Sequence, residues 1–410
     1  MGFDQDFSFG HARDIDVSQV EKTALYVHIP FCKSLCPYCP YNRIKYDEGL
    51  VAPYLAALMS EIDQYYRRLG AIEVTSIYVG GGTPTNLAGR LGMVLDMIRE
   101  RFLVTGEICM ETNPGDIGPE VIDLLVQHGV DLISLGVQSF DDRYLQLLGR
   151  SYQSDILDRT VDLVVSSGFK TVNLDLMFAL PGQTPAELMR DLARAVGTGA
   201  NQVTTYPLFC FPYSTVGKYQ KLKKVKMPDL AARRRMYRSI HGYLDEQGFQ
   251  QVSVWGFGRG QAPRYSSVTR DYYIGLGAGA GSHVPGSIYL NTFSVKEYMR
   301  SCCEDRLPVA LKMDLSHALS AYYWLYWRLY DTRIPKEQLF ELFGAHNPKL
   351  TWLLRTLSFL GMAEDTRDQV TLNERGAFWV HLAQNYFALN YINKVWSVAR
   401  ETPFPARINL

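Results

Sequence analysis

The sequence has no excess of charge of either sign. Lysine and arginine together number 42, aspartate and glutamate also number 42, and the pI is near 7.1. Proteins whose main partner is nucleic acid or an anionic membrane usually carry a clear positive excess. We therefore expect neither of these partners, and expect a small-molecule or peptide substrate instead.

The sequence also lacks long apolar runs and a secretion signal. No apolar stretch approaches the length of a membrane span, and the first six residues have neither a basic region nor an apolar core. Cysteine is scarce, at seven residues, and an odd number suits reduced thiols. These features predict a cytoplasmic protein without a membrane span.

The chain is long and carries alternating strand and helix signals. At 410 residues the chain exceeds the usual size of one compact core. Six apolar segments, each followed by a helical pattern, predict parallel βα units that form an open, partial (β/α)6 barrel. The expected strands are 25–29, 74–79, 107–112, 131–136, 171–177 and 202–208.

The chain divides into three parts by pattern. Residues 1–22 are polar and irregular, and we expect an N-terminal arm. Residues 23–300 hold the partial barrel and a less regular extension. Residues 301–410 combine helical patterns with one short strand near 369–372, which predicts a small, mainly helical, winged-helix-like C-terminal domain. The fold class is therefore α/β with a helical appendage.

Three cysteines stand at the end of the first expected strand. Cys32, Cys36 and Cys39 have the spacing C-x3-C-x2-C, and prolines at 30, 37 and 40 keep the segment out of a helix. Soft thiolates suit zinc or an iron–sulfur cluster, and three buried structural cysteines are a further alternative. A zinc site is normally closed by four ligands, whereas three thiolates on a four-iron cluster leave one iron open.

Other polar residues follow later strands. Gly80-Gly-Gly-Thr-Pro-Thr85 comes directly after the second strand, where glycines let a ligand approach the backbone or simply form a tight turn. Glu111, Gln138, Arg150 and Asp175 lie near strand ends, where barrels of this class build their sites. Asp175 interrupts an apolar strand, and a buried charge there is costly unless it is paired. Each of these could also be a salt bridge or a cap.

Taken together, the motifs resemble the radical S-adenosylmethionine (SAM) enzymes, and in particular the oxygen-independent coproporphyrinogen III oxidase-like (HemN/HemW-like) family. The resemblance covers about residues 25–282. It implies a [4Fe–4S] cluster on Cys32, Cys36 and Cys39, and a reducing partner such as flavodoxin or ferredoxin. It also implies SAM contacts, with Gly82 and Thr83 at the methionyl amino group and Glu111, Gln138, Arg150 and Asp175 around the rest; Tyr26 and Tyr38 flank the cluster.

Within this family, one position separates the branches. The coproporphyrinogen oxidase has a further cysteine where this chain has Tyr41, and it has a longer N-terminal arm. The segment Cys-Pro-Tyr-Cys-x-Tyr-Asn is similar to that of the heme chaperones and of the class C methyltransferases and cyclopropanases. The chaperones carry a histidine element after the barrel, where this chain reads Tyr265-Ser-Ser-Val-Thr-Arg-Asp-Tyr-Tyr273.

The absence of that histidine favours the class C branch. The resemblance then implies two bound SAM molecules, reductive cleavage of one, and addition of a methylene radical from the other to an unsaturated carbon of the substrate. Two alternatives stay open. One is an oxidase-like decarboxylase, and the other is a heme chaperone that uses His28 or His283.

Two further segments keep two interpretations each. Leu276-Gly-Ala-Gly-Ala-Gly-Ser282 is either a close-packed turn or, as in the family, part of the SAM and substrate region. The aromatic pattern from Tyr322 to Tyr330 is most simply a core helix of the small domain, although some of its rings could cover a planar substrate.

Overall fold

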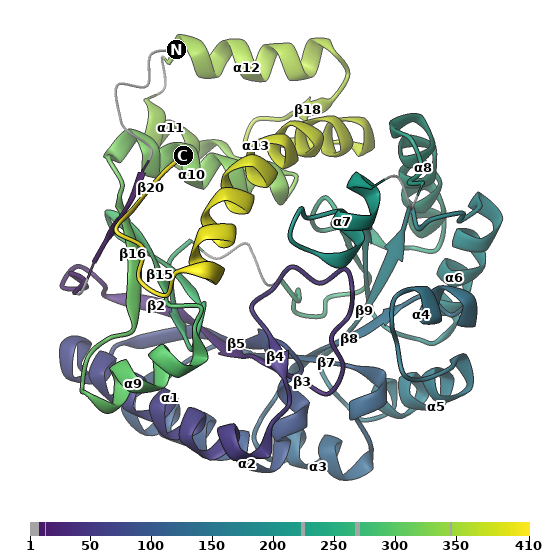
Figure 1. Ribbon diagram of the computed structural model, residues 1–410. Coiled ribbons are helices and arrows are strands. Elements are labelled where there is room, and N and C mark those ends of the chain that lie inside the picture. Colours follow the sequence, from purple (N-terminus) through teal and green to yellow (C-terminus); the bar gives the residue numbers. More distant parts are fainter. Residues whose placement is uncertain (1–7, 13, 223–225, 267–270, 345–346) are drawn as a thin grey trace.

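The computed structural model of the chain describes residues 8–12, 14–222, 226–266, 271–344 and 347–410 (Figure 1). One long sheet runs through the molecule, and two smaller sheets accompany it. The long sheet has the strand order β11-β12-β10-β9-β8-β7-β5-β2-β13-β14-β15-β16-β1-β20, with β6 beside β5. Its first half forms the barrel wall that carries the polar residues singled out above.

Six parallel strands make that wall, as predicted. They are β2 (Lys22–Ile29), β5 (Glu73–Gly81), β7 (Ile108–Thr112), β8 (Leu132–Gln138), β9 (Thr171–Phe178) and β10 (Gln202–Pro207). Every neighbouring pair among them is parallel. Within the described residues the wall stays open, because β12 (Gly256–Gly258) pairs antiparallel with β10 at one end and β13 (Tyr273–Leu276) extends it beyond β2.

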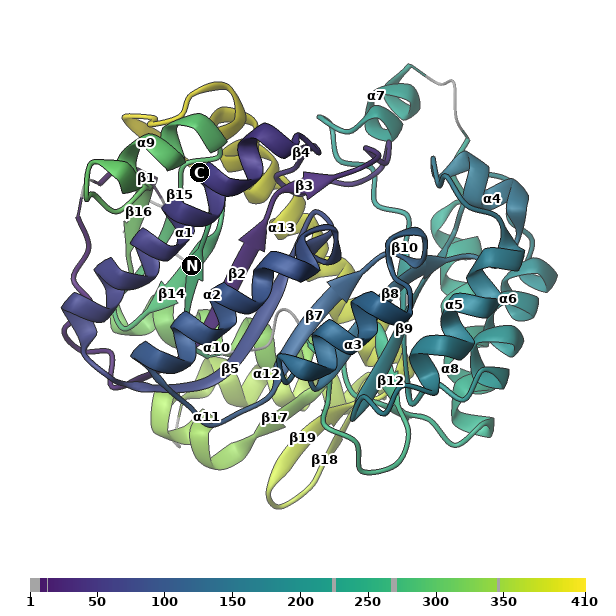
Figure 2. The ribbon, with the colours of Figure 1, turned by 90° about the horizontal axis from the view of Figure 1, so that it is seen from below.

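Helices cover the outer face of the wall, as Figure 2 shows for α1, α2, α3, α5 and α6. Residues near each helix start can determine where the helix begins. Helix α6, for example, begins with Thr184 and Glu187 in a reciprocal capping box and with Pro185 in its first turn. Among the described residues, none of the helices is both long and apolar enough to cross a membrane. The helices are α1 (Glu48–Leu69), α2 (Ala88–Arg101), α3 (Pro119–Gln127), α4 (Asp142–Leu147), α5 (Ser154–Val165), α6 (Pro185–Gly197), α7 (Thr215–Lys221), α8 (Leu230–Glu246), α9 (Val295–Cys303), α10 (His317–Tyr330), α11 (Lys336–Phe343), α12 (Pro348–Phe359) and α13 (Glu374–Glu401).

The second half of the long sheet is antiparallel. It contains β14 (Gly281–Val284), β15 (Ser287–Asn291), β16 (Val309–Asp314), β1 (Ser8–His11) and β20 (Arg407–Asn409). Residues 8–11 were expected to be irregular, but they form a strand between β16 and β20 because both neighbours supply backbone partners. β16 follows residue 300 in the chain yet pairs with β15, which precedes it. The domain boundaries at 22 and 300 stay predictions.

The C-terminal region is mainly helical with a small β wing, as predicted. The strands β17 (Arg333–Pro335), β19 (Gln369–Leu372) and β18 (Ala363–Asp365) form a three-stranded antiparallel sheet. Helices α10, α11 and α12 pack on it around Leu325, Leu339 and Val370. The long helix α13 then returns to the barrel, and its Ala377 and Phe378 belong to the same core as the barrel strands.

Candidate functional site

The three cysteines of the C-x3-C-x2-C motif lie on one short loop at the carboxyl end of the wall. Strand β3 (Phe31–Cys32) pairs in parallel with β4 (Ile44–Lys45), so the residues between them form a closed excursion (Figure 1). Arg43 stabilises this loop, because its guanidinium donates to the backbone carbonyls of Cys36 and, at 3.1 Å, of Cys39. The segment from Cys32 to Cys39 is called the cysteine loop below.

The thiols of Cys32 and Cys39 lie in a setting that disfavours their charged form. Burial, together with the neighbouring Cys39, raises the pKa of Cys32 to about 12, and burial also raises the pKa of Cys39. Among the described residues, no three Cys, His, Asp or Glu side chains are arranged to hold a single metal ion. A four-iron cluster binds each thiolate through a different iron, so its ligands stand farther apart, and its positive irons would offset the cost of ionising the thiols.

The end of β5 packs directly on the cysteine loop. The Gly82 N–H donates to the Ile29 carbonyl at 2.7 Å, and the Thr83 hydroxyl lies 3.9 Å from the Cys32 sulfur. A methyl group on Gly82 would meet the Phe31 carbonyl oxygen at 2.7 Å and the Cys32 sulfur at 3.0 Å. The backbone of this glycine motif therefore reaches the thiol region because no side chain stands between them.

Glu111 and Asp175 are two carboxyl groups inside the wall. Glu111 accepts from the Gly81 N–H at 2.9 Å and from the Tyr78 hydroxyl. Asp175 accepts from the Ser134 hydroxyl at 3.0 Å and the Asn173 amide at 2.9 Å, so the charge predicted to need a partner has neutral donors there. Burial raises the pKa of both, for Asp175 to about 7, and the nearby Glu111 adds to the rise at Asp175.

Gln138 and Arg150 lie together against Gly136. A methyl group on Gly136 would meet the Gln138 amide nitrogen at 2.9 Å and an Arg150 nitrogen at 3.4 Å. Arg150 donates to the Asn113 side chain and to the Tyr38 hydroxyl, each at 2.9 Å, which ties it to the cysteine loop. Its Nε is buried and, within the described part of the chain, has no hydrogen-bond partner. A cation in this position fits an anionic ligand such as the carboxylate of SAM.

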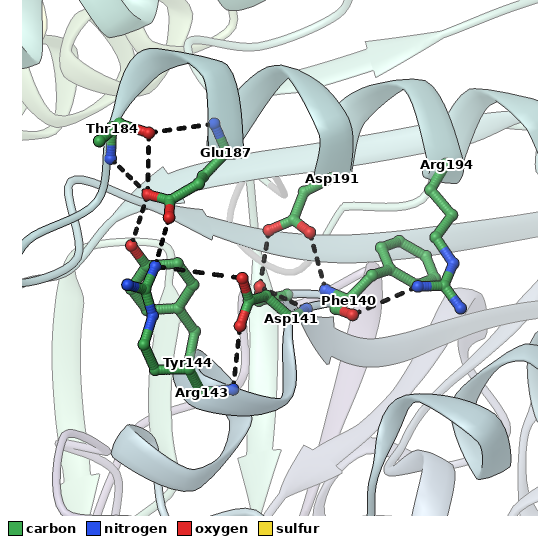
Figure 3. A network of polar contacts seen from close by, with 9 residues as sticks. Phe140, Asp141, Arg143, Tyr144, Thr184, Glu187, Asp191 and Arg194 are labelled. Carbon is green, nitrogen blue, oxygen red and sulfur yellow. Dashed lines mark hydrogen bonds and ion pairs between the residues drawn. The ribbon is translucent and has the colours of Figure 1, made fainter.

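Gln138 has a left-handed backbone, with φ of +69°, at the end of β8. The following residues are pinned to α6, because Asp191 accepts from the Ser139 hydroxyl at 2.6 Å and the Phe140 N–H at 2.9 Å (Figure 3). Figure 3 also shows the capping pair Thr184–Glu187, which Tyr144 and Arg143 join from α4. This network fixes the conformation in which Gln138 accepts from the Tyr206 hydroxyl at 2.7 Å.

Tyr26 belongs to a chain of hydrogen bonds that runs through His28 to Asn42, three residues beyond the cysteine loop. The His28 Nε2 faces the Asn42 carbonyl at 2.7 Å, so Nε2 carries the proton and Nδ1 accepts from the Tyr26 hydroxyl, also at 2.7 Å. Burial lowers the pKa of His28 to about 4, which keeps the ring neutral. Both ring nitrogens of His28 are therefore engaged.

Sequence reasoning missed the support beneath the glycine-rich segment 276–282. This segment is the turn between β13 and β14, and it lies against α1. Glu61 of α1 accepts from the Gly277 N–H at 2.8 Å, the Asn291 amide at 2.7 Å and the Tyr298 hydroxyl at 2.7 Å. A carboxylate among the apolar positions of an otherwise regular helix was the signal that could have marked it.

The structure thus brings most of the predicted residues to one end of the wall. The cysteine loop is contacted by Gly82 and Thr83, and Glu111 binds the N–H of the adjoining Gly81. Arg150 reaches the loop through Tyr38. Asp175 and Gln138 contact neighbouring strands, through Ser134 of β8 and Tyr206 of β10 respectively. The donor set of three thiols, the partly buried guanidinium of Arg150 and two carboxyl groups fits a cluster and a ligand that, like SAM, carries an amino group, a carboxylate and a sulfonium cation.

The profile of the radical SAM superfamily matches residues 26–195, which span the cysteine loop and most of the wall. A heme chaperone HemW of Mycobacterium tuberculosis is 32% identical over 296 residues, covering 70% of this chain and 76% of that protein. The chain belongs to the HemN/HemW-like family of radical SAM proteins. Family membership implies a [4Fe–4S] cluster and SAM, whereas binding of two SAM molecules stays a prediction.

Two further comparisons extend over more of the chain. An anaerobilin synthase of Escherichia coli O157:H7 is 25% identical over 393 residues, covering 93% of this chain and 87% of that protein. The solved structure of coproporphyrinogen III oxidase (HemN) from Escherichia coli matches with a TM-score of 0.76 and 22% identity, over 88% of each chain. The fold of a HemN-like radical SAM protein is thereby confirmed. The names of two curated relatives, the heme chaperone at 32% identity and an oxygen-independent coproporphyrinogen III oxidase of Bradyrhizobium diazoefficiens at 28% identity, agree with the two alternatives. None of the reported names supports the predicted methyltransferase branch.

Proposed function

We propose that this chain is a radical SAM enzyme that acts on a tetrapyrrole. The observation that carries the proposal is the anaerobilin synthase relationship, which extends over 93% of the chain and so includes the C-terminal region as well as the barrel. The relatives reported above are named for heme, a bilin or a porphyrinogen, which are all tetrapyrroles. A shared substrate class is the simplest explanation of these names.

The interior of the wall suits a flat, unsaturated ligand. Tyr26 and Tyr78 lie with ring centroids 5.9 Å apart, and Tyr78 and Tyr265 at 5.6 Å. Tyrosine combines an aromatic face, which packs on a planar ligand, with a hydroxyl that can bond its polar rim. The hydroxyls of Tyr78 and Tyr265 already bond each other next to Glu111, so these rings are fixed in place.

We infer the roles of the chain's own residues from the family resemblance, and their positions in the structure agree with it. Cys32, Cys36 and Cys39 hold the cluster, and Gly82 and Thr83 offer backbone and hydroxyl groups beside it. Arg150 binds the SAM carboxylate, while Glu111, Asp175 and Gln138 receive the ribose and the cationic centre. Tyr26 and Tyr38 lie on either side of the cluster. When bound, the cluster and SAM supply one-electron reductive cleavage of a carbon–sulfur bond.

For the reaction itself we infer that a SAM-derived carbon becomes attached to an unsaturated carbon of the macrocycle. The support is the residue at position 41, where a tyrosine replaces the cysteine of the decarboxylating oxidase. In an oxidase-like enzyme, SAM would yield 5′-deoxyadenosine alone. In the transfer reaction, S-adenosylhomocysteine or methylthioadenosine accompanies it.

A heme chaperone is the second candidate, favoured by the 32% identical relative. His28 cannot supply a free nitrogen to heme iron, because both its nitrogens are engaged. His283 differs: its Nε2 is buried and has no hydrogen-bond partner among the described residues. Of the segment 265–273, which lacks histidine, residues 267–270 lie outside the described residues.

The test is product analysis on anaerobically reconstituted protein, with dithionite, SAM and heme, followed by mass spectrometry. Cys36→Ala removes one predicted cluster ligand, and Cys303→Ser, at an exposed cysteine on α9, is the matched control. SAM cleavage that requires Cys36 but not Cys303, together with a modified tetrapyrrole, is the expected result. Stoichiometric heme binding without SAM cleavage, lost in His283→Ala, would establish the chaperone instead.

A further inference from the structure

One stretch of the chain is strongly basic although the whole chain is neutral. From Leu192 to Pro228 the sequence contains no aspartate or glutamate, and five of the nine residues from Lys218 to Lys226 are lysine. Of the lysine-rich part, the structure describes Lys218 and Lys221 in helix α7, and also Lys226. All three lysines are exposed. Among the residues that the structure describes, neither lysine of α7 is paired with an acidic side chain.

Helix α7 stands directly against the cysteine loop. The Val216 N–H in its first turn donates to the Pro37 carbonyl at 3.2 Å, and Pro37 follows Cys36 in the chain. Just before the helix, Tyr213 packs under the guanidinium of Arg400 at 4.9 Å, and Arg400 donates to the Tyr41 carbonyl at 2.9 Å. Figures 1 and 2 both show α7 beside the loop that joins β3 to β4.

The surface around this contact combines positive charge with exposed apolar side chains. Leu35 of the cysteine loop is 48% exposed, and Leu222, at the end of α7, is 64% exposed. Lys33 of the same loop is also exposed, although it pairs with Asp116 at 2.8 Å. We call Lys33, Leu35, Lys218, Lys221 and Leu222 the basic collar.

The exposure of the basic collar indicates a macromolecular partner. A small anion is usually held by cations that are partly buried around it, as Arg150 is inside the wall. Lysines on an outer helix face, mixed with exposed leucines, instead resemble the rim and centre of a transient protein interface. Because the chain as a whole has net charge +0, its net charge does not attract an acidic partner, and the exposed lysines of α7 offer a local attraction instead.

We propose that the basic collar is the docking surface for an acidic protein that carries one electron at a time, a flavin or iron–sulfur protein, and that it delivers electrons to the cluster through the cysteine loop. The proposal rests on the reductive SAM cleavage proposed above, which consumes one electron per SAM cleaved. The donor loses that electron and the sulfonium receives it. Docking on α7 brings a carrier to the outer side of the loop and leaves the interior of the wall to the substrate.

The test compares the double variant K218E/K221E with K349E/R355E, which reverses two exposed charges on the distant helix α12. The probe is an acidic bacterial flavodoxin in its hydroquinone form. Its binding to the reconstituted protein is measured at about 0.05 M and about 0.3 M salt, because screening weakens exposed charge pairs. SAM cleavage is measured in parallel with flavodoxin and with dithionite as the reductant.

We expect K218E/K221E to bind flavodoxin about tenfold more weakly at low salt and to lose most of the salt dependence. Flavodoxin-driven cleavage falls by a similar factor, whereas dithionite-driven cleavage and the melting temperature stay unchanged. K349E/R355E behaves like the wild type. The milder variant K218Q/K221Q gives an intermediate loss.

Two results would overturn the docking surface: equal binding by both double variants, or binding to anionic lipid vesicles that depends on these lysines while flavodoxin does not bind. Absence of dithionite-driven SAM cleavage in the wild type would instead contradict the proposed function. The flavodoxin-binding measurements would still test the basic collar independently.

Discussion

At the scale of single residues, the site contains positions where any added side-chain atom would collide with neighbouring atoms. Gly82 is the clearest case, because its backbone is bonded to Ile29 while its Cα faces the Phe31 carbonyl and the Cys32 sulfur. Contacts of a new methyl group below 3.0 Å with backbone atoms cannot be relieved by turning a side chain.

Gly82→Ala should therefore shift the cysteine loop. We expect a loss of about 1–3 kcal/mol in the free energy of unfolding and loss of most of the reconstituted iron. Iron and sulfide content per chain and thermal melting measure both effects. Gly89→Ala on α2 is the control, because an added methyl group there meets nothing within 4 Å. Full iron loading in Gly82→Ala would show that the loop tolerates the displacement.

A second residue-scale prediction concerns Glu61. Burial raises its pKa to about 7 from an unfolded value near 4.5. Between these values the unfolded chain has released a proton that the folded chain retains. The contribution of Glu61 to stability therefore falls as pH rises from 4.5 to 7, by about 3 kcal/mol in total.

Glu61→Gln removes this titration. The free energy of unfolding of the variant, relative to the wild type, should rise by about 3 kcal/mol between pH 4.5 and 7. Denaturant unfolding across this pH range measures it. Glu100→Gln, at an exposed position on α2, should leave the profile unchanged. Parallel pH profiles for Glu61→Gln and the wild type would contradict the prediction.

At the scale of elements, the last turn of α13 holds the segment that follows the cysteine loop. Arg400 donates to the carbonyls of Pro40 and Tyr41, and the Tyr41 ring lies 6.2 Å from that of Trp396. A helix from the far end of the chain therefore fixes the exit of the loop, which local sequence alone leaves free.

Arg400→Ala should loosen this exit while the fold stays intact. We expect a loss of about 1 kcal/mol in the free energy of unfolding and faster release of iron from the reconstituted protein. The rate of iron transfer to a chelator measures the second effect. Lys394→Ala, an exposed position on the same helix, is the matched control. Equal release rates in the two variants would show that Arg400 does not restrain the loop.

At the scale of the whole molecule, the C-terminal region shares its core with the barrel. Phe378 of α13 is 6% exposed, lies 5.5 Å from the Tyr237 ring of α8, and belongs to the core that contains the barrel strands. Trp255 also donates to His381 of α13 at 3.1 Å. Such shared burial couples the unfolding of the two regions.

We therefore expect one cooperative unfolding transition in calorimetry. Phe378→Ala should lower the free energy of unfolding by about 3–5 kcal/mol while the transition stays single. Tyr386→Ala removes a ring of the same helix that is 70% exposed, and should change stability by about 0.5 kcal/mol or less. Two separate transitions would show that the barrel and the C-terminal region unfold independently.

Much of the wall could be predicted from local pattern. Thr171–Phe178 and Gln202–Pro207 were placed within one residue, because apolar runs between glycines and prolines mark buried parallel strands wherever they stand. Strand β1 was missed, since four residues with mixed burial carry no such pattern and pair only because β16 and β20 lie beside them.

The sequence by itself determined the order of strands and helices, the cysteine spacing and the family, because these depend on neighbours in the chain. The tertiary structure decided which distant groups meet. Glu61 lies under Gly277, Arg400 lies beside Tyr41, and α7 lies against Pro37. These contacts depend on the path of the folded chain rather than on local pattern. For that reason the support of the site and the basic collar became apparent only in three dimensions.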